Sequence, residues 1–280
     1  MEQSLRDQQL LTTEVFKSLH HRAGIFVMPN PWDAGSARLL SGMGFEALAT
    51  TSAGLAYSLG KPDGQNAILR EETLRNAEAI VAATGLPVSA DLENGYGDGP
   101  ETCAETVLLA AKAGLAGCSI DDATGRSDDP IYSFELSVER IKAAVEAARS
   151  LPHHFMLTAR AENLINGRPD LKDTIQRLEA FADAGADVLF APGLKTKDEV
   201  DAVVRAVAPY PVNVIIGFIQ AAFTINELAD LGVKRVTLGS SLARAAYSAF
   251  FQAAEEVRFK GTCNYANEII SYPAFNDLFK

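Results

Sequence analysis

The stretch LPVSADLENGYGDGPETCAETVLLAAKAGLAGCSIDD, residues 86–122, contains the repeating unit that decides the fold. It begins with a short apolar run over 87–90 and continues through a glycine-bearing loop into a segment of helical periodicity over 100–114. A second apolar run follows over 117–120. Short apolar runs without alternation are typical of strands that are buried on both faces. The unit therefore predicts a strand, a helix and a second, parallel strand.

The same alternation recurs along the chain. Apolar runs predict eight strands, over 25–28, 47–50, 87–90, 117–120, 155–158, 187–190, 212–216 and 235–238. Segments of helical periodicity follow them, over 36–43, 71–85, 100–114, 137–150, 173–185, 197–208, 224–232 and 241–259. This pattern predicts an α/β protein, a (β/α)8 TIM barrel. The competing fold, an open doubly wound sheet, usually has a glycine-rich phosphate loop after its first strand, where this chain reads PNPWDAGSARL.

No linker-like or low-complexity segment divides the chain. We therefore expect one barrel domain over 1–280, with an N-terminal helix over 1–22 and a C-terminal extension over 260–280. The extension is rich in apolar side chains, namely Tyr265, Ile269, Ile270, Tyr272, Phe275, Leu278 and Phe279. Two interpretations stay open for it: packing on another subunit, or packing on its own barrel.

The composition restricts the class of partner. Lys and Arg number 25 against 36 Asp and Glu, which gives a net charge of −11. An acidic protein repels phosphate backbones and anionic lipid heads, so we expect neither nucleic-acid nor membrane binding. The apolar runs are shorter than a membrane span, and the polar N-terminal region lacks the apolar core of a secretory signal. The three cysteines form no CxxC pair, which favours reduced thiols in a cytoplasmic protein.

Carboxylates stand at the ends of two predicted strands, where the active site of a barrel lies. The third strand is expected to end at Asp91, with Glu93 just beyond it, and the fourth to end at Asp121. Because side chains alternate along a strand, Asp91 and Glu93 are expected on the same side. Crowded carboxylates repel one another, and a divalent cation with hard oxygen ligands, Mg²⁺ above all, relieves that repulsion. The alternative is a pair that caps the N–H groups of the glycine turn.

Further candidates lie at neighbouring strand ends. Arg160 ends the fifth predicted strand and is expected either to clamp a substrate carboxylate or to form a salt bridge on the barrel rim. Asn213, on the seventh, is a substrate-binding candidate. Small residues over 50–54 offer backbone N–H groups to an anionic oxygen. Asp63 lies in the stretch KPDG, where a plain turn is the alternative. No histidine stands at these strand ends, which argues against a zinc site.

Together these elements resemble the isocitrate lyase/phosphoenolpyruvate mutase superfamily, especially its short phosphonomutase-like and carboxyphosphonoenolpyruvate-mutase-like members. The similarity extends from Pro29 to about Tyr247. The stretches that carry it are PNPWDAGSARLLSGMGFEAL, TTSAGLAYSLGKPDG, ADLENGYGD, GCSIDDATG, ARAENLINGRPDLKDTIQRLEAFADAGADVLFAPG and VNVIIG.

The resemblance implies a tetrameric barrel, a dimer of dimers, often with the eighth helix swapped between paired subunits. It also implies a Mg²⁺ ion, or Mn²⁺ in its place, and a pyruvate-like enolate intermediate. Asp91 resembles the acidic residue closest to the metal. Glu93 and Asp121 resemble carboxylates of the metal shell that act partly through water, and Asp121 is also a catalytic candidate.

For the substrate, the resemblance implies a small carboxylate held by three groups of residues. Asp63 resembles the loop aspartate near the reacting group, and Arg160 the arginine at the substrate carboxylate, so both are catalytic candidates. Thr51, Ser52 and Ala53 match the backbone segment that holds the oxo-acid.

The loop after Asp121 departs from the family pattern. Isocitrate and methylisocitrate lyases carry a K-[KR]-C-G-H motif there, whose cysteine is their catalytic acid, whereas this chain reads DATGRSDD over 122–129. The phosphonate enzymes carry lysine and asparagine in a gating loop at the same place, and this loop has only Arg126. Asp121 also replaces the usual glutamate, and Glu93 the commoner aspartate.

The favoured hypothesis is a Mg²⁺-dependent lyase that cleaves a C–C bond of a small 2-hydroxy- or 2-oxo-dicarboxylate through a pyruvate-type enolate. Its reaction resembles that of methylisocitrate or dimethylmalate lyase, or an oxaloacetate decarboxylation. The first alternative is a phosphonate enzyme of the same superfamily, a mutase or a phosphonopyruvate hydrolase. An unrelated Mg²⁺ aldolase on the same fold and a non-catalytic barrel that binds an oxo-acid are further alternatives.

Overall fold

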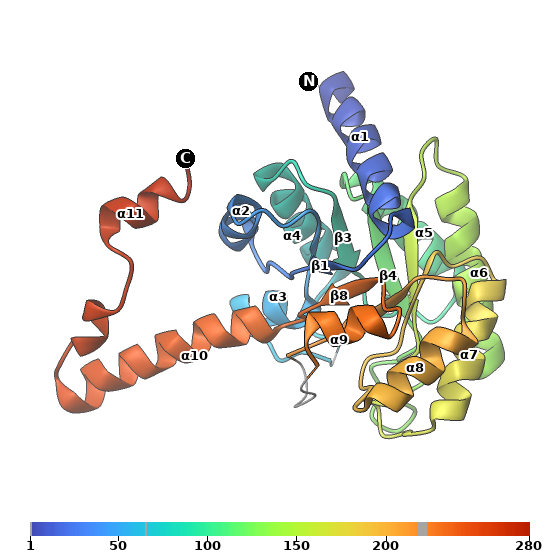
Figure 1. Cartoon of the computed structure of the whole chain (residues 1–280). Coiled ribbons are helices and arrows are strands. Elements are labelled where there is room, and N and C mark those ends of the chain that lie inside the picture. The colour runs from blue at the N-terminus through green and yellow to red at the C-terminus, as the bar shows by residue number, and fades with distance from the viewer. Residues whose placement is uncertain (1, 65, 218–222) are drawn as a thin grey trace.

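A computed structural model of the chain describes residues 2–64, 66–217 and 223–280. Eight parallel strands form one sheet in the order β1-β8-β7-β6-β5-β4-β3-β2, and the seam between β1 and β2 is bridged by a hydrogen bond from Ala49 N to Pro29 O of 3.0 Å. The predicted barrel is confirmed (Figure 1). Its strands are β1 (Phe26–Met28), β2 (Leu48–Ala49), β3 (Val88–Asp91), β4 (Gly117–Asp121), β5 (Met156–Arg160), β6 (Val188–Phe190), β7 (Val212–Ile215) and β8 (Arg235–Thr237).

The helices surround the strands and begin at side-chain caps in several places. Ser133, Asp170, Thr196 and Thr224 each accept a hydrogen bond from a backbone N–H of the first helical turn that follows. The helices are α1 (Glu2–His21), α2 (Ala34–Gly42), α3 (Ser52–Ser58), α4 (Arg70–Ala83), α5 (Pro100–Lys112), α6 (Phe134–Arg149), α7 (Leu171–Asp183), α8 (Lys197–Ala206), α9 (Ile225–Asp230), α10 (Ser241–Glu255) and α11 (Tyr272–Asp277). A π-helical turn (Glu256–Lys260) and a 3₁₀ turn (Asn264–Asn267) separate the last two.

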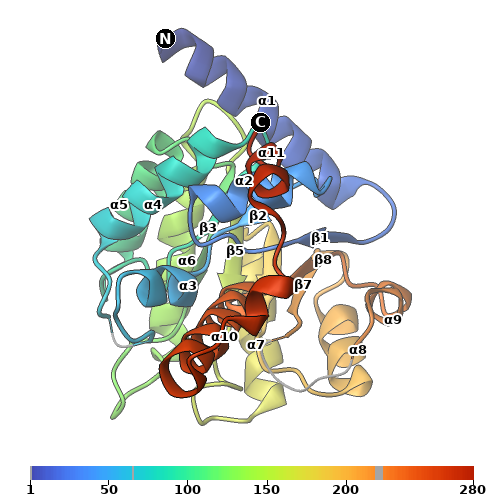
Figure 2. The same ribbon diagram turned by 90° about the vertical axis from the view of Figure 1, so that its left-hand side faces the viewer.

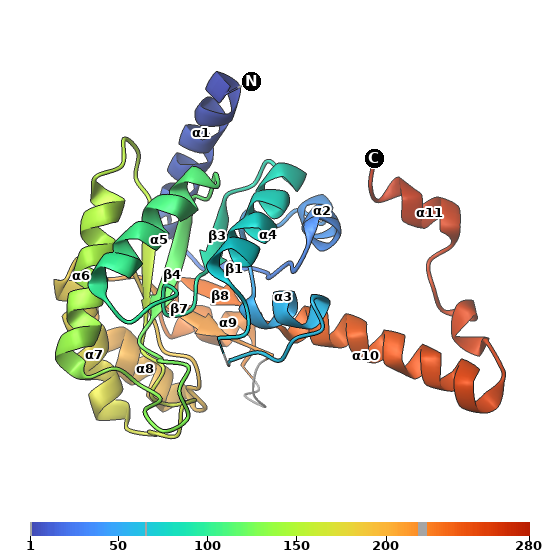
Figure 3. The same cartoon turned by 180° about the vertical axis from the view of Figure 1, so that it is seen from behind.

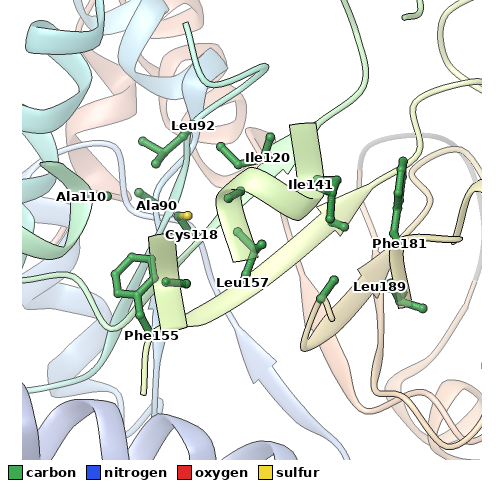
Figure 4. Close-up of a cluster of buried hydrophobic side chains, with 14 of the residues drawn as sticks. Ala90, Leu92, Ala110, Cys118, Ile120, Ile141, Phe155, Leu157, Phe181 and Leu189 are labelled. Carbon is green, nitrogen blue, oxygen red and sulfur yellow. The ribbon is translucent and has the colours of Figure 1, made fainter. Parts of the chain in front are cut away.

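Two apolar clusters hold the barrel together. The larger one lies between the strands and the outer helices, and Figure 4 shows part of it around Cys118, Leu157 and Phe181. The smaller one fills the amino-terminal end of the barrel, where Phe16 and Leu19 of α1 pack on side chains from β1, β5 and β6. Helix α1 therefore closes the end of the barrel opposite the predicted site, and Met1 of the predicted helix 1–22 lies outside the described residues.

Helix α10 does not lie against its own barrel as the other outer helices do. It extends away from the strands in Figures 1 and 3, and Figure 2 looks at it from its far end. Ala243 near its N-terminus is buried, whereas Phe250 and Phe251 are 70% and 61% exposed. The chain then turns back, and Arg38 of α2 donates a hydrogen bond to Phe279 O at 3.4 Å.

The cysteines are free thiols, with Cys103 and Cys118 buried and Cys263 exposed. Within the described ranges, no helix combines the length and the apolar character that a membrane crossing requires.

Candidate active site

A cavity of about 240 Å³ opens at the carboxyl ends of the strands. Its walls come from the ends of the strands and from the loops that follow them. Its lining includes five carboxylates and two arginines: Asp63, Asp91, Glu93, Asp121, Glu162, Arg160 and Arg235. This excess of carboxylates over arginines sets the chemistry of the cavity.

Arg160, the last residue of β5, forms the centre of the charged cluster. Its Nη1 lies 2.8 Å from Asp91 Oδ1, and its Nη2 lies 2.8 Å from Glu162 Oε1. The guanidinium also lies over the ring of Phe190, 5.0 Å from the ring centroid. Burial opposes the charged form, but Glu162, Asp91 and Asp121 together raise the pKa of Arg160 well above its ordinary value. Arg160 therefore stays charged and ties the ends of β3 and β5 together.

Glu93 reaches the cavity by a route that strand alternation did not predict. Strand β3 ends at Asp91, and Glu93 has a left-handed φ of +47°, so the alternating pattern does not extend to it. The turn nevertheless directs Glu93 into the cavity lining, and its backbone carbonyl accepts a hydrogen bond from Asp121 N at 2.9 Å. Burial, followed by the charges of Asp91 and Asp63, raises the pKa of Glu93 from 4.5 to about 7.

The remaining carboxylates of the cavity are also crowded. Burial and then Asp91 raise the pKa of Asp63, which lies in the loop after α3. Burial and then Glu162 raise the pKa of Asp121, the last residue of β4. Glu162 was not predicted as a site residue, although its position two residues beyond Arg160 repeats the spacing of Asp91 and Glu93. The cavity therefore holds more negative charge than its arginines compensate.

The segment predicted to hold an oxo-acid begins a short helix, α3, that the sequence did not reveal. Thr51 is its N-cap, and its Oγ1 accepts a hydrogen bond from Gly54 N at 3.2 Å. Ser52 Oγ donates to Asp91 Oδ2 at 3.1 Å, and Ala53 lines the cavity beside it. Thr51, Ser52 and Ala53 thus lie in the cavity wall, and the Ser52 hydroxyl is already bound to Asp91.

Asn213 lies at the floor of the cavity and is fully buried. Its Oδ1 accepts a hydrogen bond from Arg235 Nε at 2.9 Å, and its Nδ2 donates to Thr237 Oγ1 at 3.0 Å. Both ends of the amide therefore have partners within the protein, and the predicted contact with substrate stays a prediction.

A buried ion pair supports Glu162 from behind. Asp122 Oδ1 accepts a hydrogen bond from Glu162 N at 2.8 Å, and Asp122 Oδ2 lies 2.9 Å from Arg177 Nη1. The same Nη1 donates to Ser137 Oγ at 3.1 Å. Arg177 on α7 therefore fixes the loop that carries Glu162. Its position in a helical segment of the sequence did not indicate this function.

The loop after β4, residues 122–134, contributes two small residues to the cavity lining. Its cation, Arg126, does not belong to that lining. Ala123 and Gly125 line the cavity, whereas Arg126 lies 3.0 Å from Asp98 and is 42% exposed in its side chain. Asn66 Nδ2 donates to Thr124 O at 3.3 Å, which joins this loop to the one that carries Asp63. The loop therefore brings no positive charge to the reacting centre.

The donor set fits a hard divalent cation in its chemistry. Carboxylate oxygens are the ligands that Mg²⁺ prefers, and a dication would relieve the repulsion that raises the pKa of Asp63, Glu93 and Asp121. Among the described residues, however, no three His, Cys, Asp or Glu side chains converge closely enough to hold an ion, so Asp91, Glu93 and Asp121 do not form a preformed ligand group. Arg160 occupies one oxygen of Asp91. A bound ion would therefore keep several water ligands.

Comparison with known proteins identifies the family that this chain resembles. The model of the phosphoenolpyruvate phosphomutase family matches residues 16–258. A Burkholderia cenocepacia J2315 protein, described only provisionally as a lyase/mutase, has a crystal structure with 56% identity and a TM-score of 0.94, covering 98% of this chain and 97% of that one. The 2-methylisocitrate lyase of Salmonella typhimurium is 32% identical over 82% of this chain and 79% of its own. Oxaloacetate acetylhydrolase in complex with its product oxalate is 28% identical, with a TM-score of 0.86 over 96% of this chain and 93% of that one.

Proposed function

Because this chain belongs to the phosphoenolpyruvate phosphomutase family, within the isocitrate lyase/PEP mutase superfamily of lyases and mutases, we propose that it is a Mg²⁺-dependent carbon–carbon lyase. Its substrate would be a small 2-hydroxy- or 2-oxo-dicarboxylate, cleaved in the cytoplasm through a pyruvate-type enolate. The observation that carries the proposal is the cavity in which Arg160 is held by Asp91 and Glu162 among further carboxylates.

Some residues of the cavity would bind the substrate and the metal ion, and others would transfer protons. Arg160 would bind the carboxylate of the oxo-acid, and the N–H groups at the start of α3, beside Ser52, would face the negative charge that grows on the 2-oxo oxygen. Asp91, Glu93 and Asp121 would hold the Mg²⁺ ion, which supplies Lewis-acid polarisation of that oxygen when bound. Manganese would serve in its place, since it takes the same oxygen ligands.

Protons at the reacting carbon would come from the cavity carboxyls. Burial and then the charge of Asp91 raise the pKa of Asp63, so its carboxyl holds a proton more readily than a free aspartate does. The cysteine acid of methylisocitrate lyases has no counterpart among the described lining residues, since Cys103 and Cys118 lie in the apolar core. We therefore assign the acid–base step to Asp63, with Asp121 in support.

The charges in the cavity favour C–C cleavage over phosphonate chemistry. Among the described lining residues, the cations are Arg160 and Arg235, and both are already bound to protein acceptors. A phosphonate would bring about two negative charges where the second carboxylate of a dicarboxylate brings one, and Arg126, the cation of the loop after β4, pairs with Asp98. A small dicarboxylate or oxo-acid suits this site better.

We also propose that the protein assembles as a homotetramer, a dimer of dimers in which α10 is exchanged between paired subunits. Helix α10 leaves its own barrel without cover from an eighth helix and exposes Phe250 and Phe251, and the π-helical turn that follows it exposes Phe259. In a two-fold pair, each α10 would occupy the place that the partner's α10 leaves open. The exposed apolar side chains would then be buried by a second copy of this chain.

A substrate panel tests the proposed reaction. Oxaloacetate, dimethylmalate, methylisocitrate and phosphonopyruvate would be incubated with Mg²⁺, and the release of pyruvate, of other oxo-acids and of phosphate would be measured. The lyase proposal expects Mg²⁺-dependent cleavage of a carbon substrate that is lost in the variant Asp91→Ala. Phosphate release from phosphonopyruvate alone would establish the phosphonate alternative instead, and binding without turnover of a wide panel would favour the non-catalytic one.

A further inference from the structure

Arg235, the first residue of β8, lies beneath the carboxylate cluster in an unusual environment. It lines the floor of the cavity and is only 3% exposed. Its guanidinium donates to Asn213 Oδ1 at 2.9 Å and to Thr158 Oγ1 at 2.9 Å. Its Nη1 lies 3.2 Å from His20 Nε2. In the part of the chain that the structure describes, no carboxylate forms an ion pair with it.

The histidine partner is neutral, so it does not compensate the charge. His20 Nδ1 lies 2.8 Å from Phe16 O and must donate its hydrogen there, which leaves Nε2 as an acceptor for Arg235. Burial, followed by the charge of Arg235, lowers the pKa of His20 to about 3. Burial alone lowers the pKa of Arg235 to about 9, which still leaves the guanidinium charged at neutral pH. Its positive charge is therefore held by neutral acceptors only.

A buried charge without a counter-ion is costly, and proteins usually pair it. Here three elements cooperate to keep it: α1 supplies His20, β5 supplies Thr158 and β7 supplies Asn213. The cavity whose floor Arg235 lines is rich in opposite charge, since its lining includes Asp91, Glu93 and other carboxylates. The arrangement sends a positive field into that cavity from a fixed position.

We infer that Arg235 is the fixed counter-charge of the cavity, which favours an anionic oxo-acid there and limits the affinity of the site for cations. Arg235 acts on bound ions through the electrostatic field of its guanidinium. It does not touch the reacting atoms, so it is a positioning residue and not a catalytic one. This inference rests on the proposed function, because it names Mg²⁺ and an oxo-acid as the ions concerned. It predicts opposite effects on a cation and an anion, which a merely structural residue would not produce.

The test uses isothermal titration calorimetry on full-length protein, with Mg²⁺ alone, oxalate alone, and oxalate in saturating Mg²⁺. The charge-removing variant is Arg235→Met, the charge-keeping variant is Arg235→Lys, and Thr158→Val is the matched control that removes one hydrogen-bond acceptor without changing any charge. At an effective dielectric constant of about 20 and a separation of about 10 Å, loss of one buried charge changes the binding of a singly charged ion by more than about tenfold, and that of a doubly charged ion by more still.

We expect Arg235→Met to bind Mg²⁺ at least about tenfold more tightly and oxalate at least about tenfold more weakly than the parent. Arg235→Lys and Thr158→Val should leave both affinities within about twofold, whatever they do to the melting temperature. If Arg235→Met does not fold, Arg235→Gln, which retains a donor for one acceptor, takes its place. Weakening of both ligands together, or no change in either, would overturn the inference.

The parent protein separates this inference from the proposed function. If the parent binds oxalate but not Mg²⁺, the metal-dependent lyase proposal fails, and the metal-free oxalate titration still decides the role of Arg235. If the parent binds oxalate neither alone nor with Mg²⁺, the proposed function and the proposed role of Arg235 are both refuted. The cavity would then be neither an oxo-acid site nor a site that favours anions.

Discussion

Replacement of Glu93 by glutamine should stabilise the metal-free protein at alkaline pH, at the expense of its metal site. The folded protein raises the pKa of Glu93 from 4.5 to about 7, mainly by burial and then by Asp91 and Asp63. Between these two pH values the folded state holds a proton that the unfolded state has lost. Stability therefore falls as the pH rises through this window, and above it the loss reaches up to about 3 kcal/mol.

Glutamine has nearly the same shape and no charge to lose, so Glu93→Gln should escape this loss. We expect the variant to be more stable than the parent by up to about 3 kcal/mol near pH 8 and by little near pH 4.5. Urea unfolding in the presence of a chelator, at pH values across the window, would measure the difference. Glu78→Gln, at an exposed position on α4, is the matched control and should change stability little at any pH.

This prediction is wrong if Glu93→Gln is no more stable than the parent near pH 8, or if its added stability does not depend on pH. Either result would mean that burial and the charges of Asp91 and Asp63 do not raise the pKa of Glu93. Addition of Mg²⁺ provides a second check: it should stabilise the parent through linkage and stabilise Glu93→Gln less, because one carboxylate of the proposed metal shell is gone.

Four further predictions concern other parts of the molecule. Arg160→Met should lower kcat/KM by about 10²-fold or more, since it removes the proposed donor to the oxo-acid, and steady-state kinetics would show this. Arg177→Met should destabilise the protein by about 3–5 kcal/mol in urea unfolding, because it leaves the buried Asp122 unpaired. Arg126→Met should leave kcat/KM within about twofold in the same assay, since its pair with Asp98 is exposed to solvent and it does not line the cavity. Phe250→Asp should shift the oligomer toward smaller species in size-exclusion chromatography with light scattering, because a charge would be buried in the proposed subunit contact.

The strands of the barrel were predictable to within one or two residues at each end. Each lies in a short, largely apolar run that is buried on both faces, so the apolar residues in the sequence indicate the strand. Helix α3 escaped prediction because it is seven residues long and follows a strand at once, with Thr51 as cap and too few positions for helical periodicity to appear.

The candidate site was predictable where it depends on strand ends, and less so where it depends on loops. Asp91, Asp121 and Arg160 end their strands and line the cavity as expected. Glu93 also lines it, but through a left-handed turn that strand alternation does not describe. Arg235 is the first residue of its strand, where no site residue was expected, and its partner His20 comes from a helix more than two hundred residues earlier, so only the folded chain brings them together.

We propose that Asp91 and its neighbours hold a divalent cation together with an enolate-like anion. The most direct test is the melting temperature of the parent and of Asp91→Asn with oxalate, a flat mimic of the enolate, in the presence and absence of Mg²⁺. We expect oxalate to raise the melting temperature of the parent far more with Mg²⁺ than without it, and Asp91→Asn to lose this Mg²⁺-dependent increase. An equal shift with and without Mg²⁺, or a full increase in Asp91→Asn, would contradict it.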